Sequence, residues 1–196
     1  MTQLAYGIET RGNLVLKMVK KVLAIAGALA LVALLVVPFL IPVKTTGTLT
    51  KEQAAESVWG ERSQWITLAG HEVHYVRAGD PLSDKLIVLL HGFGASAYSY
   101  KEVLQPLSAV GQVIAYDRAA FGFTERPTDW GEVNPYGIEG QLEVLDELIA
   151  EFGQGKDVYV LGHSAGGSIA ASFAEQHSEK LTGLILFAPA VLTAGG

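Results

Sequence analysis

The sequence contains no cysteine, and this absence excludes several kinds of chemistry. Without thiols the chain can form no disulfide framework, no thiolate metal site and no cysteine nucleophile. It also lacks a metal-ligand cluster and a dinucleotide-binding fingerprint, so we expect no metal and no cofactor. His71 and His74 point to opposite faces of an expected strand, and we interpret them as surface residues rather than ligands.

Basic residues are scarce in the main part of the chain. From Lys51 onward there are nine Lys and Arg residues against nineteen Asp and Glu residues, a balance of −10. An acidic globular part argues against nucleic acid as a partner. The length of 196 residues is enough for one domain with a real core and marginal for two.

Charge is absent from residues 22–43, an apolar run long enough to cross a bilayer. An uncleaved anchor and a secretory signal peptide are the competing interpretations. A signal h-region is typically about 7–15 residues and ends in a small-residue cleavage site. This run is longer and leaves through Pro38-Phe-Leu-Ile-Pro42, so we favour the anchor. Its apolar character on all sides argues against a buried core helix.

The flanks of this run predict how it would sit in a membrane. The first 21 residues carry four basic side chains against one acidic one, whereas Lys44 stands alone on the other side. We therefore predict a single-pass protein with its N-terminus in the cytoplasm and its C-terminal domain outside. The predicted organisation is a basic segment (1–21), an anchor (22–43), a tether (44–60) with a short helix around Glu52–Val58, and a globular part (61–196).

Hydrophobic periodicity predicts an α/β fold, with a mostly parallel sheet and flanking helices. Alternating residues around Ala69-Gly70 predict an antiparallel hairpin over 64–77 at a sheet edge. In a helix over 97–107, Tyr98, Val103, Leu104 and Leu107 are expected to form the inner face. Continuous apolar runs predict buried strands over 85–90, 112–116, 157–162 and 181–187, with further helices over 138–152 and 165–175.

The segment 157–175 carries the strongest functional signal. Its corner reads Gly162-His-Ser-Ala-Gly166, which fits the G-x-S-x-G nucleophile elbow between a strand and a helix. A serine on such a sharp turn has a strained backbone, and glycine two residues to either side removes the Cβ atoms that would collide. The N-terminus of the following helix can stabilise negative charge on a reacting carbonyl oxygen.

Three motifs, in order and spacing, resemble the α/β-hydrolase fold family over about residues 64–190. They are His91-Gly-Phe-Gly94, Asp117-Arg-x-x-Phe-Gly122 and the elbow. The resemblance implies Ser164 as the nucleophile and the backbone N–H groups of Phe93 and Ala165 as the oxyanion hole. It further implies a structural turn pair, Asp117-Arg118, with a substrate-binding role for Arg118 as the weaker alternative. The residues implied to support the site's loops are His91, Gly92, Gly94, Gly162, His163 and Gly166.

The identity of the nucleophile separates members of this family. Relatives that open epoxides or displace halide carry aspartate at the elbow, so Ser164 argues against both reactions. The resemblance instead implies acyl transfer to serine followed by attack of water. The expected partner is a small-molecule ester, thioester, lactone or related acyl compound.

The chain departs from the family after the elbow. The family order is serine, acid, then histidine, yet no Asp or Glu follows Glu179 and no His follows His177. His177 is expected about four helical turns from Ser164, roughly 20 Å along the helix, and too far to take its proton. We therefore expect this chain to be the N-terminal part of a longer membrane-anchored serine hydrolase. The chain itself lacks the acid and the histidine of the triad, so we expect it to be inactive.

Two other functions remain open on these residues. One is a non-catalytic half-fold that acts as a binding or interaction module through an open, apolar sheet edge. The other is an enzyme of the same fold with different chemistry, an acyltransferase or a cofactor-free peroxidase.

Overall fold

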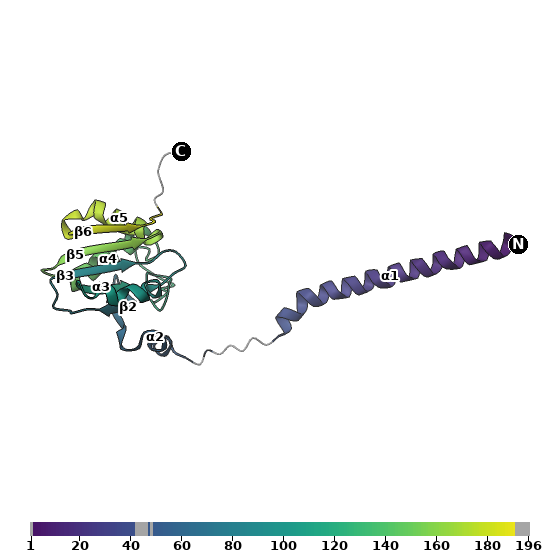
Figure 1. The fold of residues 1–196 in the computed structure, drawn as a ribbon, viewed down its shortest axis with the longest axis horizontal. Helices are drawn as coiled ribbons and strands as arrows, with labels where there is room; N and C mark the ends of the chain where they lie inside the picture. The colour runs from purple at the N-terminus through teal and green to yellow at the C-terminus, as the bar shows by residue number, and fades with distance from the viewer. Residues whose placement is uncertain (1, 42–46, 48, 191–196) are drawn as a thin grey trace. The chain divides into compact units, whose positions relative to one another are not determined.

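The computed structural model describes residues 2–41, 47 and 49–190 and divides the chain into two units, Met1–Gly47 and Thr48–Gly196. In the described part of the first unit the chain forms one helix, α1 (Thr2–Leu40; Figure 1). Its 25-residue stretch Leu16–Leu40 is long and apolar enough to cross a membrane, a test that an N-terminal signal sequence also passes. At 1.5 Å per residue this stretch is about 37 Å long, more than the ~30 Å hydrocarbon core of a bilayer.

Helix α1 ends at Leu40, before the predicted end of the apolar run. Pro38 lies inside its last turn, where it cannot donate a backbone hydrogen bond. Ile41 precedes a proline, a position at which the α conformation is sterically disfavoured. The last two residues of the predicted anchor and most of the start of the predicted tether (42–46 and 48) lie outside the described residues.

Part of the predicted tether is packed rather than free. Helix α2 (Lys51–Trp59) begins with a capping box in which Thr50 and Gln53 satisfy each other's backbone N–H groups. It buries Ala55 and Trp59, and Trp59 joins the core of the second unit. The segment 44–60 therefore contains a helix that belongs to the packed unit.

The described residues of the second unit form a sheet in the order β1-β2-β4-β3-β5-β6. Strand β2 pairs antiparallel with β1 and with β4. Strand β3 pairs parallel with β4 and β5, and β5 pairs parallel with β6. The predicted edge hairpin and the mostly parallel sheet are confirmed. The strands are β1 (Ser63–Leu68), β2 (His71–Ala78), β3 (Lys85–Leu90), β4 (Gln112–Tyr116), β5 (Asp157–His163) and β6 (Gly183–Phe187).

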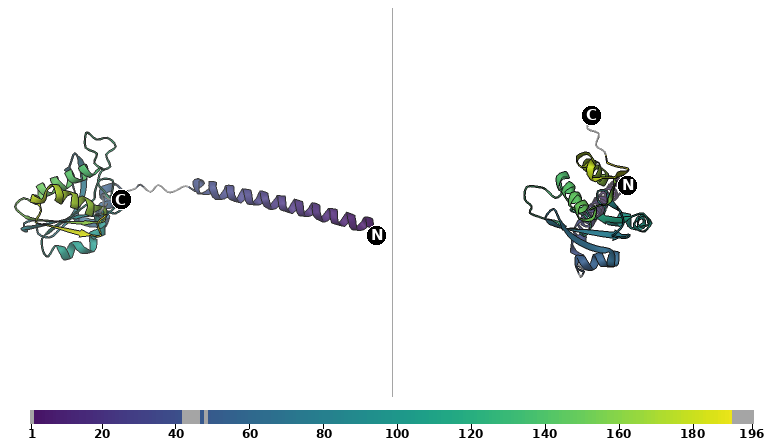
Figure 2. Two further views of the ribbon diagram at one scale, coloured as in Figure 1. Left: turned by 90° about the horizontal axis from the view of Figure 1, so that it is seen from above. Right: turned by 90° about the vertical axis from the view of Figure 1, so that its left-hand side faces the viewer.

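Helices cover both faces of this sheet (Figure 2). On one face α4 (Ile138–Phe152) and α5 (Ala165–Gln176) pack against a core that includes Leu145 and Phe173. On the other face α3 (Lys101–Leu107) packs through Leu104. Three short 3-10 turns complete the described elements: η1 (Gly60–Arg62), η2 (Ala97–Tyr100) and η3 (Ser178–Lys180).

The prediction that His71 and His74 lie on the surface is wrong, because both are buried. The Nδ1 atom of His71 lies 3.2 Å from the carbonyl oxygen of Ala69. His74 bridges Ser63 Oγ (2.9 Å from Nε2) and the Asp117 carboxylate (2.8 Å from Nδ1). Although β1 lies at the edge of the sheet, the loop that follows β4 covers the part of the hairpin that holds His74.

The predicted inner face of the helix over 97–107 is only partly correct. Leu104 is fully buried and Leu107 packs against the core, but Tyr98 and Val103 are exposed. The first turn is a 3-10 helix, whose period of three residues rotates Tyr98 away from the face that α3 buries.

The predicted burial of the last strand is also wrong. In β6 the side chains from Leu184 to Phe187 are 37–66% exposed. Among the described residues, β6 pairs only with β5, and α5 covers one of its two faces. The same apolar composition that suits a buried strand therefore lies at an open edge of this sheet.

Candidate active site

Ser164 lies at the corner between β5 and α5, as the elbow motif predicts. Its backbone has φ 51° and ψ −121°, a conformation that residues with a side chain rarely adopt. Such a strained residue persists only where its surroundings hold it, and strain of this kind concentrates at functional sites.

The glycines beside Ser164 allow three pieces of backbone to meet. A Cβ atom on Gly162 would lie 2.5 Å from the carbonyl oxygen of Gly166 and 2.6 Å from the Cα atom of Gly167. A Cβ atom on Gly166 would overlap the carbonyl oxygen of Leu90 at the end of β3. The glycine spacing of the motif thus lets α5 start in contact with both β5 and β3.

The start of α5 presents backbone donors at this corner. No residue in the described part of the chain accepts a hydrogen bond from the N–H of Ala165. The Ser164 side chain makes no capping bond to the helix either. The first N–H groups of a helix have no intrahelical acceptor and carry the positive end of its dipole, so an anion beside Ser164 would be favoured.

The loop that follows β3 lies against the same corner. A Cβ atom on Gly92 would be 3.1 Å from Ser164 Cβ and 3.2 Å from His163 Nδ1, so this glycine permits the close approach. Within the described residues the N–H of Phe93 also has no acceptor, and the next residue, Gly94, has φ +67°. The structure therefore brings together the loop and the elbow that the resemblance pairs.

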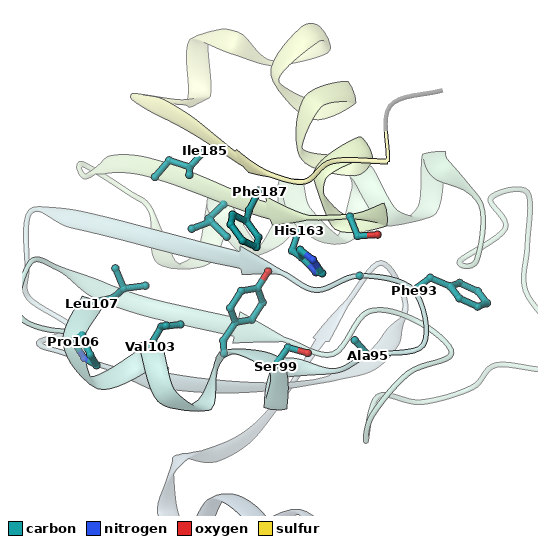
Figure 3. Close-up of a pocket in the computed structure, with 13 residues that line it drawn as sticks. Phe93, Ala95, Ser99, Val103, Pro106, Leu107, His163, Ile185 and Phe187 are labelled. Carbon is teal, nitrogen blue, oxygen red and sulfur yellow. The ribbon is translucent and has the colours of Figure 1, made fainter. Parts of the chain in front are cut away.

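An open pocket of about 600 Å³ lies beside Ser164, between α3 and the C-terminal halves of β5 and β6 (Figure 3). Its walls are largely apolar and include Val103, Leu161, Ile185 and Phe187. Figure 3 shows the ring of Phe93 turned away from this pocket, in agreement with its 84% exposure. These lining residues were not predicted from the sequence, although strand alternation places Leu161, Ile185 and Phe187 on one face of β5 and β6.

His91 supports the loop by hydrogen bonds. It is fully buried, its Nδ1 atom donates to the carbonyl oxygen of Gly92 (2.8 Å), and its Nε2 atom accepts from the backbone N–H of Arg118 (3.0 Å). Burial lowers the pKa of His91 from 6.5 to about 4. With both nitrogens occupied and the ring neutral, His91 is not placed to act as the base for Ser164.

The turn pair of the second motif is buried. Asp117 accepts hydrogen bonds from the backbone N–H groups of Ala97 (2.7 Å) and Phe123 (2.8 Å) and from His74. Burial acts to raise the pKa of Asp117, but the hydrogen bonds outweigh it and the pKa is lowered. A Cβ atom on Gly122 would overlap this carboxylate. These contacts fit the predicted structural role.

No acid or histidine among the described residues is hydrogen-bonded to Ser164 Oγ. His177 caps the far end of α5, as predicted, and its ring packs against Phe173 at 4.9 Å between centroids. His163 lines the pocket next to Phe187, with ring centroids 5.6 Å apart. In the described part of the chain no group of three or more His, Asp or Glu side chains is placed to hold a metal ion.

We expect His91→Gln to weaken the dependence of stability on acid pH. Between pH 6.5 and 4 the unfolded chain binds a proton at His91 that the folded chain does not bind, so folding stability falls as the pH falls through this window. From pH 7.5 to 4.5 this contributes about 2–3 kcal/mol to the loss. Glutamine keeps one donor and one acceptor but does not titrate.

Denaturant unfolding of the full chain in mild detergent, followed by tryptophan fluorescence at both pH values, measures this difference. Equal losses of stability in His91→Gln and the natural chain would contradict the lowered pKa of His91.

A mostly parallel sheet with a strained serine between β5 and α5, and a glycine-rich loop beside it, defines the class of protein. The chain belongs to the alpha/beta hydrolase fold family, whose model matches residues 85–194, more than half of its length.

Named relatives share this part of the chain. It is 35% identical over 118 residues to epoxide hydrolase 3 of Xenopus tropicalis, covering 60% of this chain and 31% of that protein. It is 32% identical over 127 residues to the AB hydrolase superfamily protein YfhM of Bacillus subtilis strain 168, covering 64% and 43%. Among solved structures, a membrane phospholipase A shares the fold with a TM-score of 0.59 and 24% identity, covering 89% of this chain and 53% of that one. The chain thus spans less than half the length of these two curated relatives.

Proposed function

We propose that this chain carries the nucleophile and the oxyanion hole of a membrane-anchored serine hydrolase that acts on an ester or a related acyl compound. The observation that carries the proposal is the strained backbone of Ser164 beside two backbone donors, the N–H groups of Ala165 and Phe93, for which the described residues offer no acceptor. An oxyanion needs such preorganised donors, and each contributes about 3 kcal/mol to stabilising the transition state.

In the proposed reaction, Ser164 Oγ attacks the acyl carbon while a base removes its proton. The carbonyl electron pair moves onto the oxygen, which the N–H groups of Ala165 and Phe93 stabilise. The leaving group departs with a proton, and water then attacks the acyl-enzyme and releases the acid. No acid or histidine among the described residues is hydrogen-bonded to Ser164 Oγ, so we expect negligible ester turnover by this chain alone.

Serine at the elbow is also the reason for choosing acyl chemistry, although a relative is named an epoxide hydrolase. An alkyl ether formed between serine and an opened epoxide has no carbonyl group for water to attack, whereas a serine ester has one. Treatment with a fluorophosphonate probe and mass spectrometry of the Ser164 peptide tests the proposal. A phosphonyl group on Ser164 supports it, and an unmodified Ser164 after prolonged treatment contradicts it.

We also propose that α1 anchors the protein in a bilayer with the N-terminus in the cytoplasm. When the full chain is expressed in cells, it is expected to stay in the membrane pellet after a carbonate wash at about pH 11, because the apolar stretch of α1 is buried in lipid. A deletion of residues 2–40 serves as the control and is expected to be released. Release of the intact chain, or recovery of a form cleaved after α1, would contradict an uncleaved anchor.

A further inference from the structure

Arg118 is a buried cation with an unusual set of partners. Arg118 is only 6% exposed, and among the described residues no carboxylate forms an ion pair with it. Its Nε atom donates to the carbonyl oxygen of His91 (3.0 Å), and its Nη2 atom donates to that of Gly92 (3.1 Å). The guanidinium also lies over the ring of Phe121, 5.1 Å from its centroid.

Burying a guanidinium without a carboxylate is costly, and stability alone gives no reason to do so. The neighbouring carboxylate of Asp117 is engaged elsewhere, with Ala97, Phe123 and His74. The charge of Arg118 is therefore directed at two backbone oxygens of one short loop. Its planar fork suits this task, because it presents two N–H groups in fixed directions.

These bonds set the orientation of one peptide group. The carbonyl oxygen of Gly92 receives two donors, Arg118 Nη2 and His91 Nδ1. The peptide that joins Gly92 to Phe93 is trans, so its N–H points opposite to its carbonyl oxygen. Holding the oxygen on the Arg118 side aims the N–H of Phe93 to the other side of the peptide, and no described residue accepts a hydrogen bond from it.

The loop needs such a restraint. Gly92 and Gly94 flank Phe93, and glycine leaves the backbone the greatest freedom to rotate. The Phe93 ring is largely exposed, so it contributes little to holding its own backbone, apart from an edge contact with Phe121 at 5.6 Å.

We propose that Arg118 is a positioning residue for the oxyanion hole: by holding the carbonyl oxygens of His91 and Gly92, it aims and polarises the N–H of Phe93. This inference rests on the proposed function, in which that N–H binds the oxyanion. Donors on a peptide oxygen also strengthen the N–H of the same amide, since hydrogen bonds in a chain polarise one another.

The first test measures the rate at which a fluorophosphonate modifies Ser164 in the full 196-residue chain, in detergent at about pH 9, by intact mass. An oxyanion hole retains reactivity without the other triad members, so a slow, stoichiometric reaction is expected. Arg118→Lys keeps the charge but cannot span both oxygens. We expect its maximum rate constant to fall about 10- to 100-fold, with the half-saturating probe concentration unchanged.

Two further variants separate positioning from folding. A merely structural role would lower the fraction of chain that reacts, whereas positioning lowers the rate constant of the folded fraction. Guanidinium at millimolar concentration should partly restore the rate of Arg118→Ala, and ammonium should not. Arg62→Lys, an exposed Arg that donates to Gln105, is the matched control with an unchanged rate. An Arg118→Lys rate within twofold of the natural chain would overturn the proposal.

The second test does not depend on the reactivity of Ser164. In ¹⁵N-labelled full chain, Arg118→Lys is expected to shift the amide resonance of Phe93, while resonances of β1 and α4 stay in place. An unmoved Phe93 resonance would overturn the positioning role even if Ser164 reacts. A shifted Phe93 resonance in a chain whose Ser164 never reacts would support the positioning and contradict the proposed function.

Discussion

Replacing Ser164 by alanine is expected to abolish modification of the chain by a fluorophosphonate probe, a loss of at least about 100-fold in the rate. The hydroxyl is the only group that this substitution removes, and alanine keeps the Cβ atom that the corner already accommodates. The reaction depends on that oxygen because it lies at the strained turn beside the donors of Ala165 and Phe93. Intact mass measures the extent of modification, and circular dichroism confirms that the variant is folded.

Ser99→Ala provides the matched control, because Ser99 lines the same pocket but lies on the 3-10 turn η2. It is expected to be modified as fast as the natural chain. Modification that persists in Ser164→Ala, and that peptide mapping places on another serine, would remove Ser164 from the role of nucleophile.

The second large effect concerns the packing under the elbow. Gly166→Ala is expected to destabilise the folded chain by more than about 4 kcal/mol, or to prevent folding altogether. The new methyl group would overlap the carbonyl oxygen of Leu90 and lie 2.6 Å from that of His91. The backbone at the end of β3 cannot move away from the methyl group, because β3 is hydrogen-bonded on both sides, to β4 and to β5. Denaturant unfolding of the full chain in detergent measures the loss.

Gly131→Ala is the control for this substitution. Nothing lies within 4 Å of a Cβ atom at Gly131, and its backbone is not in the left-handed region. We expect a change within about 0.5 kcal/mol. Near-natural stability of Gly166→Ala would show that α5 does not start in contact with the end of β3.

Much of the fold was predictable because its signals are local. Periods of two and about 3.6 residues marked the strands and helices, and the bounds of the helix Ile138–Phe152 agree with the prediction. The corner at Ser164 was predictable for a similar reason, since the glycines that relieve its crowding lie within two residues of it.

Burial was less predictable, since it depends on what covers a face. His71 and His74 are polar residues in a hairpin at the sheet edge, where surface positions are expected, yet both are buried. The run that ends at Phe187 has the composition of a buried strand, but lies exposed at an edge of the sheet. The type of a side chain indicates whether it can be buried, but it does not determine which other elements of the fold cover it.

By itself, the sequence determined the elements, the elbow and the family resemblance, because each rests on residues only a few positions apart. Only the tertiary structure decided that Gly92 meets Ser164 across 72 positions of the chain and that Arg118 holds the carbonyls of His91 and Gly92. The physical reason is the strand order: β3 lies between β4 and β5, so the loops after these three parallel strands meet at one edge of the sheet. That pairing is a property of the whole sheet, and no short segment encodes it.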